Sequence, residues 1–290
     1  MGLFGRPGGA RGGSSIRIII GLVIAVIALI SYFMRTEVNP VTGEKQRIAM
    51  TTEQEITLGL QAAPEMAAQM GGVVDTRDPQ AALVRNIGKK VWQSSDAVRS
   101  PYTFEFHLLR DPESINAFAL PGGQIFITRG LLDQLENEAQ LAGVLGHEIG
   151  HVINRHAAEH MAKSQLGGAL AAAAGVAASD ERGRGLNAAL IAQAVNQMMQ
   201  LRYGRKDELE ADDYGLRYMI QAGYDPSAMV SVMHVLAQAS KGRGGPEFLA
   251  THPHPEARIK QIERFLAEKY PNGIPPDLTA GRSLQLMGGR

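Results

Sequence analysis

The sequence contains no cysteine, and this absence excludes several kinds of site at once. A chain without thiols has no disulfide, no thiolate metal site, no cysteine nucleophile and no lipidated N-terminal cysteine. Any metal must therefore be held by His, Asp or Glu side chains. The formal net charge is zero, so the charge balance does not indicate nucleic-acid binding, and we expect no nucleic-acid partner.

Length and composition allow one catalytic domain of ordinary size. The chain has 290 residues, of which 44% are hydrophobic and 20% are charged, so it can form a packed core and is not globally disordered.

One long apolar run, residues 18–34, lies near the N-terminus between Arg17 and Arg35. A helix of this length rises about 26 Å, near the lower limit for crossing ~30 Å of hydrocarbon. We predict a single-pass membrane anchor that contacts lipid. The alternative is a cleaved signal peptide, which the sequence disfavours because Phe33-Met34-Arg35 stands where a small-residue cleavage site is needed.

Residues 1–17 form a basic leader that contains three arginines and no acidic residue. Positive flanks stay on the cytoplasmic side. We therefore predict an inner (cytoplasmic) membrane protein with its N-terminus in the cytoplasm and its catalytic domain outside, in the periplasm. An organelle transit sequence is the weaker reading of this leader.

Apolar periodicity and capping signals predict an α+β fold that is mostly α, placed over residues 51–271 between a polar linker (35–50) and an irregular tail (272–290). The expected strands are 102–109 and 124–128. The Ala/Gly tract 166–178 is too short for a second membrane span and is expected to be a weakly packed helix or lid. Helices are expected over 53–62 (with a capping box of Thr52 and Glu55), from Asp78-Pro79, from Asn137 to about Glu159, over 186–222, from Asp225-Pro226, and from Pro255 to about Tyr270.

The strongest motif is His147-Glu148-Ile149-Gly150-His151, an H-E-x-x-H sequence inside a predicted helix. Residues four apart on a helix share one face, so both imidazoles can bind one ion while Glu148 lies within reach of a metal-activated water. The alternative is an ordinary helix whose histidines form hydrogen bonds in the core. Apolar neighbours upstream and the capped helix favour a buried zinc site.

Catalytic zinc has three protein ligands and an open position. In the acidic segment 205–215, Glu208 and Asp212 share a helical face with the small residues Ala211 and Gly215, which permit close approach to another helix. We predict Glu208 as the third ligand and Asp212 as the acceptor for the free N–H of a ligand histidine. A charged surface helix is the alternative, and the opposite stripe (Glu210, Asp213 and Arg217) is expected to face solvent.

With Glu208-x-x-Ala211-Asp212 following the H-E-x-x-H motif, the sequence resembles the membrane-associated HExxH gluzincin peptidases. These include the CAAX prenyl protease, HtpX, the mitochondrial Oma-type protease and the periplasmic protease BepA. The likeness extends through residues 116–123 and 130–132 and covers roughly residues 51–270. It implies a zincin-like domain with a short β-sheet edge. Two departures limit it: this chain shows one clear anchor where HtpX and the CAAX protease have several, and it lacks room for the repeat domain of BepA.

The resemblance implies two further sites. In the family, two segments border the cleft where substrate pairs as an added strand. They match Asn116, Ala117, Phe118 and Ala119 and the strand 124–128 of this sequence. Such pairing is expected of an exposed sheet edge. A plain hairpin edge is the alternative. The family's Thr-His-Pro histidine can move onto the zinc, and it matches His252. A capping or loop role for His252 and His254 is equally open.

The ligand set predicts an endopeptidase with one Zn²⁺ per chain, acting on polypeptides through zinc-activated water with Glu148 as general base. We expect substrates that are misfolded or unassembled envelope proteins. The alternatives are an anchored chaperone that binds without cutting and a metal-storage or sensor site. Oligomeric state stays open. The oxyanion donor is left among Arg205, His254 and Tyr203, and structural roles are expected for His107, His156, His160 and His234.

Overall fold

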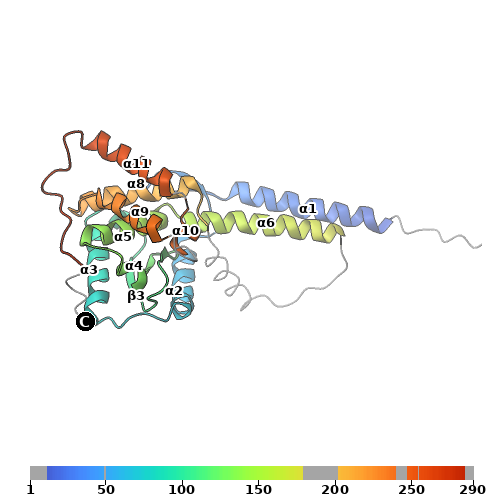
Figure 1. Cartoon of the computed structure of the whole chain (residues 1–290). Helices are drawn as coiled ribbons and strands as arrows, with labels where there is room; N and C mark the ends of the chain where they lie inside the picture. Colours follow the sequence, from blue (N-terminus) through green and yellow to red (C-terminus); the bar gives the residue numbers. More distant parts are fainter. Residues whose placement is uncertain (1–11, 49, 179–201, 240–246, 254, 285–290) are drawn as a thin grey trace, which may run out of the picture.

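The computed structural model describes residues 12–48, 50–178, 202–239, 247–253 and 255–284. Most of them form a helical body around a small sheet, and two long helices lie side by side and project from this body (Figure 1). The predicted α+β, mostly α class is confirmed. Of the described helices, only α1 is long and apolar enough to cross a membrane, over Ile16–Met34.

Helices dominate the described part of the chain, and its strands all lie before α4. In chain order the elements are α1 (Gly12–Met34), β1 (Thr36–Val38), β2 (Lys45–Arg47), α2 (Thr52–Gln69), α3 (Pro79–Gln93), η1 (Asp96–Arg99), β3 (Glu105–Leu109), β4 (Ala117–Ala119), β5 (Gln124–Thr128), α4 (Arg129–Leu132), α5 (Glu138–Ile153), α6 (His156–Ala178), α8 (Arg205–Gln221), α9 (Ala228–Ala239), α10 (Glu247–Thr251) and α11 (Pro255–Lys269).

Three strands form a mixed sheet in the order β3-β5-β4. The central strand β5 has the predicted bounds, is buried along its whole length and runs parallel to β3. β3 begins at Glu105, where pairing with Gln124 starts, and not at Tyr102. β4 pairs antiparallel with β5 on the other side and is the outer strand of the sheet.

The start of α2 differs from the predicted cap. Thr51 is the N-cap, because its side chain accepts a hydrogen bond from the Gln54 N–H while the Gln54 side chain accepts one from the Thr51 N–H. Glu55, which the sequence placed in this box, is buried and accepts hydrogen bonds from Tyr102 and Arg155. The helix also continues to Gln69, past the predicted end at residue 62.

The helix that carries the H-E-x-x-H motif, α5, ends at Ile153 and not near Glu159. Arg155 has a φ of 54°, a left-handed conformation that interrupts a right-handed helix. Its guanidinium is buried and forms ion pairs with Glu55 and Glu37, which hold the chain in this turn. A separate helix, α6, then begins at His156.

The predicted polar linker, residues 35–50, contains an ordered hairpin formed by β1 and β2. The side-chain amides of buried Asn39 and Gln46 donate hydrogen bonds to the carbonyls of Ile153 and Asn154. These carbonyls lie at the end of α5, where helix carbonyls lack partners within the helix. The segment after α1 is therefore attached to the end of the motif-bearing helix.

Other boundaries also differ from the predictions. Gly204 is extended, so the described part of the helix predicted over 186–222 begins at Arg205; residues 179–201 lie outside the described residues. α9 starts at Ala228, after a turn in which Asp225 accepts from the Ser227 N–H. The tract 166–178 is the second half of α6 and lies along α1.

Candidate metal centre

α5 positions the first three residues of the site. Asn137 caps the helix by accepting from the Gln140 N–H, and every residue from Glu138 to Ile153 is buried. His147 and His151 are four residues apart and project from the same face, with their Nε2 atoms 3.0 Å apart. Glu148 is fully buried beside them.

α8 brings Glu208 to the same point because small residues let it approach α5 closely. A Cβ atom added to Gly146 would lie 3.2 Å from the Gly215 carbonyl oxygen, and one added to Gly150 would lie 2.8 Å from that of Ala211. The small face predicted on α8 is therefore the one in contact with α5. Larger side chains there would push the Glu208 carboxylate away from the histidines.

Four side chains bring their donor atoms together in a compact cage. Besides the two histidine Nε2 atoms, Glu208 Oε1 lies 3.4 Å from His151 Nε2, and Glu208 Oε2 lies 3.6 Å from His147 Nε2. His252, between α10 and α11, contributes Nδ1, which lies 3.0 Å from Glu208 Oε1 and 3.3 Å from His147 Nε2. All four side chains are buried, and they are a group able to hold a metal ion.

The cage fits zinc in both size and chemistry. Zinc–nitrogen and zinc–oxygen bonds of about 2.0–2.1 Å in a tetrahedron place neighbouring ligand atoms about 3.3–3.4 Å apart, close to the distances found between these donors. Glu208 Oε2 is buried and forms an ion pair with Arg258 Nη1 at 2.8 Å, which holds the carboxylate in place. The donors themselves, imidazole nitrogens and a carboxylate oxygen, are of the kinds that bind zinc.

Asp212 and Arg258 support His147 from outside the cage. Asp212 Oδ1 lies 2.9 Å from His147 Nδ1 and accepts its N–H, which leaves Nε2 directed at the cage. Arg258 on α11 is fully buried and donates to both Asp212 oxygens, at 2.7 and 2.6 Å. The sequence predicted the contact of Asp212 but did not identify Arg258, which lies 46 residues further along the chain.

His156 supports His151 in the same way, although the sequence assigned it only a structural role. His151 Nδ1 lies 2.9 Å from His156 Nδ1, and His156 Nε2 lies 3.3 Å from Glu210 Oε2. The chain His151–His156–Glu210 orients the second ligand ring. Glu210 and Asp213, both predicted to face solvent, are only partly exposed, whereas Arg217 is exposed as predicted and forms an ion pair with Asp213.

His156, Asp207 and Glu210 also have atoms close enough to form a second metal group. Each is already paired, however: His156 with His151 and Glu210, and Asp207 with the Gly204 N–H and with His160 Nε2. We therefore assign them to the support of the first site.

Removing His156 tests that support. In His156→Ala, the His151 ring loses the partner that fixes its orientation, and we expect the zinc dissociation constant to rise about 10–100-fold, as for other outer partners of metal ligands. Zinc competition against a fluorescent chelator measures this constant without any use of activity. His234→Ala, on an exposed position of α9, is the matched control and should leave the constant unchanged. Equal affinity in both variants would contradict this role for His156.

The electrostatics favour the metal-binding forms of His151 and Glu208. Burial lowers the pKa of His151 well below its ordinary value, so its ring is neutral. Burial alone would raise the pKa of Glu208, but His252 and Arg258 outweigh it, and the pKa lies well below its ordinary value. Neutral imidazole and ionised carboxylate are the forms that bind metal.

Burial of the site also changes the pKa of Glu148, and here the net shift is upward. Burial raises the pKa of its carboxyl, and the nearby His252 and His147 counteract this only in part. Neither Glu148 oxygen has a hydrogen-bond partner within the part of the chain that the structure describes. A carboxyl group with a raised pKa and free lone pairs is suited to accept and return a proton.

A buried H-E-x-x-H helix joined by a glutamate from a second helix defines a zinc metallopeptidase of the gluzincin type. The chain belongs to peptidase family M48, because the sequence model of that family matches residues 78–266. It is thus a metalloendopeptidase, a hydrolase that acts on peptide bonds, and M48 peptidases bind zinc.

Several curated proteins are similar to this chain. This chain is 32% identical over 240 residues to the mitochondrial metalloendopeptidase OMA1 of Schizosaccharomyces pombe. The matched region covers 82% of this chain and 68% of that relative. The chain is 34% identical over 244 residues to a putative beta-barrel assembly-enhancing protease of Vibrio cholerae, with 80% of this chain and 48% of the relative covered. For the beta-barrel assembly-enhancing protease of Escherichia coli, the identity is 33% over 183 residues, with 61% and 37% covered. The chain therefore spans half or less of these bacterial relatives.

The candidates for the oxyanion donor and the histidines with expected structural roles differ in whether they contact the cage. Tyr203 is buried and its ring stacks on His151 with centroids 4.0 Å apart. Arg205 is exposed at the start of α8, and His254 lies outside the described residues. His107 on β3 and His234 on α9 have no contact with the cage, whereas His160 contacts Asp207 and the ring of Tyr203 at its periphery.

Proposed function

We propose that this chain is a membrane-anchored zinc endopeptidase that cleaves misfolded or unassembled proteins of the cell envelope, with Glu148 as its general base. The observation that carries this proposal is the buried carboxylate of Glu148 beside a four-donor cage. A site that only stored or sensed metal would have no use for an unpaired acid there.

The proposed chemistry divides the work between the ion and the protein. Zinc, when bound by His147, His151 and Glu208, supplies a positive charge that polarises the scissile carbonyl and lowers the pKa of water. Glu148 takes the proton from the attacking water and passes it to the departing amine. Asp212 and His156 keep the two ligand rings in the orientation that this requires.

We propose that the cage with His252 is a latent arrangement. His252 Nδ1 fills the fourth corner, the position that catalytic zinc sites keep open. Its other nitrogen, Nε2, lies 3.8 Å from Glu148 Oε1, so the ring also covers the general base. Movement of His252 away from both groups would expose them to substrate.

The outer strand β4 suits substrate binding by strand addition. The Leu120 N–H donates to the Gln124 carbonyl, and the Asn116 carbonyl accepts from the Thr128 N–H. Every second residue along β4 therefore directs its backbone N–H and C=O groups toward β5. By this alternation Ala117 and Ala119 direct their N–H and C=O groups away from β5. Ala119 lines a cavity together with His151 and Tyr203, which places the strand next to the cage.

A proline at the outer strand tests this binding mode. Ala119→Pro removes one outward N–H donor, and proline is tolerated on edge strands where the N–H is not used in the sheet. We expect KM for an extended peptide to rise several-fold, with kcat and zinc content little changed. Ala119→Val, which keeps the donor, is the control. A KM that changes equally in both variants would contradict strand addition.

The cellular role rests on α1 and on the relatives. An apolar N-terminal helix suits either a membrane anchor or a signal sequence. We favour the anchor, with residues 1–17 as a cytoplasmic leader, 18–34 in the inner membrane and the domain over 51–271 in the periplasm. The printed names of the relatives, a mitochondrial metalloendopeptidase and beta-barrel assembly-enhancing proteases, support a role at membranes. The rival is an anchored chaperone that binds polypeptides without cutting them.

Digestion of casein, an unstructured substrate, tests the proposed activity and the latent state together. We expect zinc-loaded wild-type protein to cleave casein, a chelator to stop cleavage and added zinc to restore it. His252→Ala should cleave faster than wild type, because three ligands still hold zinc and the fourth position is open. Gel electrophoresis over time with metal analysis measures both effects.

Two outcomes of this experiment would count against the proposal. Casein left intact by both proteins, with stoichiometric zinc present, would favour the chaperone. Slower cleavage by His252→Ala with full zinc content would show that His252 assists the reaction and does not block it.

A further inference from the structure

The second half of α6 lies beside the membrane helix α1, away from the helical body (Figure 1). α6 leaves the body at His156, whereas α1 enters it at Met34, so the two helices run antiparallel. This contact is not part of the metal site.

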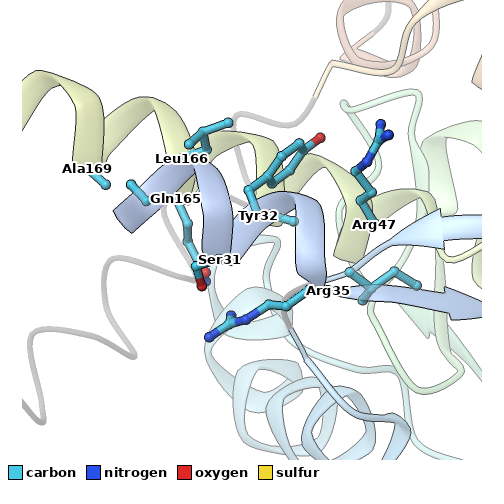
Figure 2. Close-up of a pocket in the computed structure, with 10 residues that line it drawn as sticks. Ser31, Tyr32, Arg35, Arg47, Gln165, Leu166 and Ala169 are labelled. Carbon is cyan, nitrogen blue, oxygen red and sulfur yellow. The ribbon is translucent and has the colours of Figure 1, made fainter. Parts of the chain in front are cut away.

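The residues around one cavity give the alignment of the two helices. It has a volume of about 200 Å³ and lies where they meet the body (Figure 2). Its walls include Ala28 and Ser31 of α1 together with Gln165 and Ala169 of α6. In antiparallel order, Ala28 then lies level with Ala169, and each further step along α1 matches one step back along α6.

With this alignment, the boundary between polar and apolar sequence falls at one level on both helices. On α1 the apolar run stops at Arg35, and on α6 the last charged residue is Lys163. Ala162, next to Lys163, lines the same cavity as Arg35. Beyond Lys163, residues 164–178 contain no charged side chain. The apolar part of α6 is therefore level with the part of α1 that is predicted to lie in lipid.

The helices face each other through small residues. The covered side of α1 includes Gly21, Ala25 and Ala28, and that of α6 includes Ala169 and Ala173. Small residues spaced by four let helix backbones approach closely, which is typical of helix pairs in membranes.

The opposite sides of both helices are exposed and apolar. α1 presents Val23, Val26 and other aliphatic side chains, and α6 presents Gly168, Ala171 and Ala174. A Cβ atom added to Gly168 would meet nothing within 4 Å. Such a surface is costly in water when it is continuous over two helices. Hydrocarbon is the partner whose chemistry it matches.

The base of the pair has the polarity of a membrane–water boundary. The cavity lining includes Arg35 and Arg47 together with the ring of Tyr32, and it contains no acidic residue. Figure 2 shows Gln165, Leu166 and Ala169 beside Ser31 and Tyr32. Arginine and tyrosine are enriched where helices leave the hydrocarbon.

From these observations we propose that α6 enters the bilayer beside α1, so that the membrane element is a two-helix hairpin in contact with lipid. Residues 164–178 rise about 22 Å and penetrate without spanning ~30 Å of hydrocarbon. Because α6 begins at His156, which contacts His151, the same helix joins the bilayer to the metal site. The inference rests on α1 being an anchor, as proposed above, and not on peptidase activity.

Depth measurements on single spin labels test this arrangement, and a chain without cysteine needs no background mutations. The full chain is reconstituted in phosphatidylethanolamine–phosphatidylglycerol vesicles. Labels are placed at Ala171→Cys and Ala174→Cys on α6, and at the matched exposed positions Val26→Cys and Val23→Cys on α1. Leu60→Cys, exposed on α2 in the body, is the aqueous control. Collision rates with oxygen and with a water-soluble chromium oxalate complex give the depth of each label.

We expect Ala171 to match the depth of Val26, and Ala174 that of Val23, to within about one helical turn, about 5 Å. All four labels should meet oxygen readily and the chromium complex rarely, with Leu60 showing the reverse. Aqueous labels on α6 beside deep labels on α1 would overturn the hairpin while leaving the anchor intact. Aqueous labels on both helices would overturn the anchor as well. Labels on α6 that meet neither reagent would overturn the lipid contact, because protein, such as a second copy of the chain, would then cover that face.

Discussion

Glu148→Gln is expected to lower the rate of peptide hydrolysis by about 10²–10⁴-fold, the usual contribution of a general acid–base group. Glutamine keeps the size of the side chain but cannot accept the proton of the attacking water. Glu148 is fully buried, and neither of its oxygens has a hydrogen-bond partner in the described part of the chain, so no structural hydrogen bond is lost. The variant should therefore retain its fold and its zinc.

Three measurements separate the catalytic role from a structural one. The rate of cleavage of a quenched fluorescent peptide gives the loss of activity, zinc analysis gives the metal content, and the melting temperature reports the fold. Glu65→Gln, on an exposed position of α2, is the control and should behave like wild type. A Glu148→Gln protein that retains zinc and near-normal activity would show that another group accepts the proton.

The second large effect is expected at Arg258, whose removal should destabilise the protein by about 3–5 kcal/mol, as for other broken buried ion pairs. Arg258 is fully buried between Asp212 and Glu208. Arg258→Met preserves much of the volume but leaves two buried carboxylates without their cation. Zinc compensates for only part of this charge, because Asp212 does not belong to the cage. Chemical denaturation with and without zinc measures the free energy of unfolding.

Arg217→Met is the matched control for Arg258→Met. Arg217 also pairs with an aspartate, Asp213, but both side chains are partly exposed on the surface of α8. An exposed pair of this kind contributes about 0–1 kcal/mol. If both arginine variants lose the same small amount of stability, Arg258 does not neutralise the charge of the buried carboxylates. The proposed support of His147 through Asp212 would then be wrong as well.

The sequence was informative wherever a site depends on residues close together on one helix. Spacing of four on α5 predicted a shared face for His147 and His151, and spacing on α8 predicted that Glu208 and Asp212 would lie with Ala211 and Gly215. The predicted bounds of β5, residues 124–128, are also those of the structure. Such features follow from helix and strand geometry, which repeats with the same period in every protein.

Predictions failed where a distant partner decides the local structure. The capping signal at Asn137 predicted where α5 begins, but α5 ends because Arg155 is held by Glu55 and Glu37 from other parts of the chain. The polar segment 35–50 was predicted to be a linker, yet Asn39 and Gln46 bind the carbonyls at the end of α5. In both places tertiary hydrogen bonds outweigh local propensity.

The sequence by itself determined the class of chemistry: the absence of cysteine, the H-E-x-x-H helix and the glutamate on a small-residue face leave a zinc site made of His and Glu. Only the tertiary structure decided the rest of its surroundings. Arg258 and His156 have no spacing that links them to the ligands, and His252 was indicated by the family resemblance and not by spacing, because contacts between separate segments depend on how helices pack and not on a repeat within any one of them. The level at which α6 meets α1 likewise emerges only when the two segments, far apart in the chain, lie side by side (Figure 1).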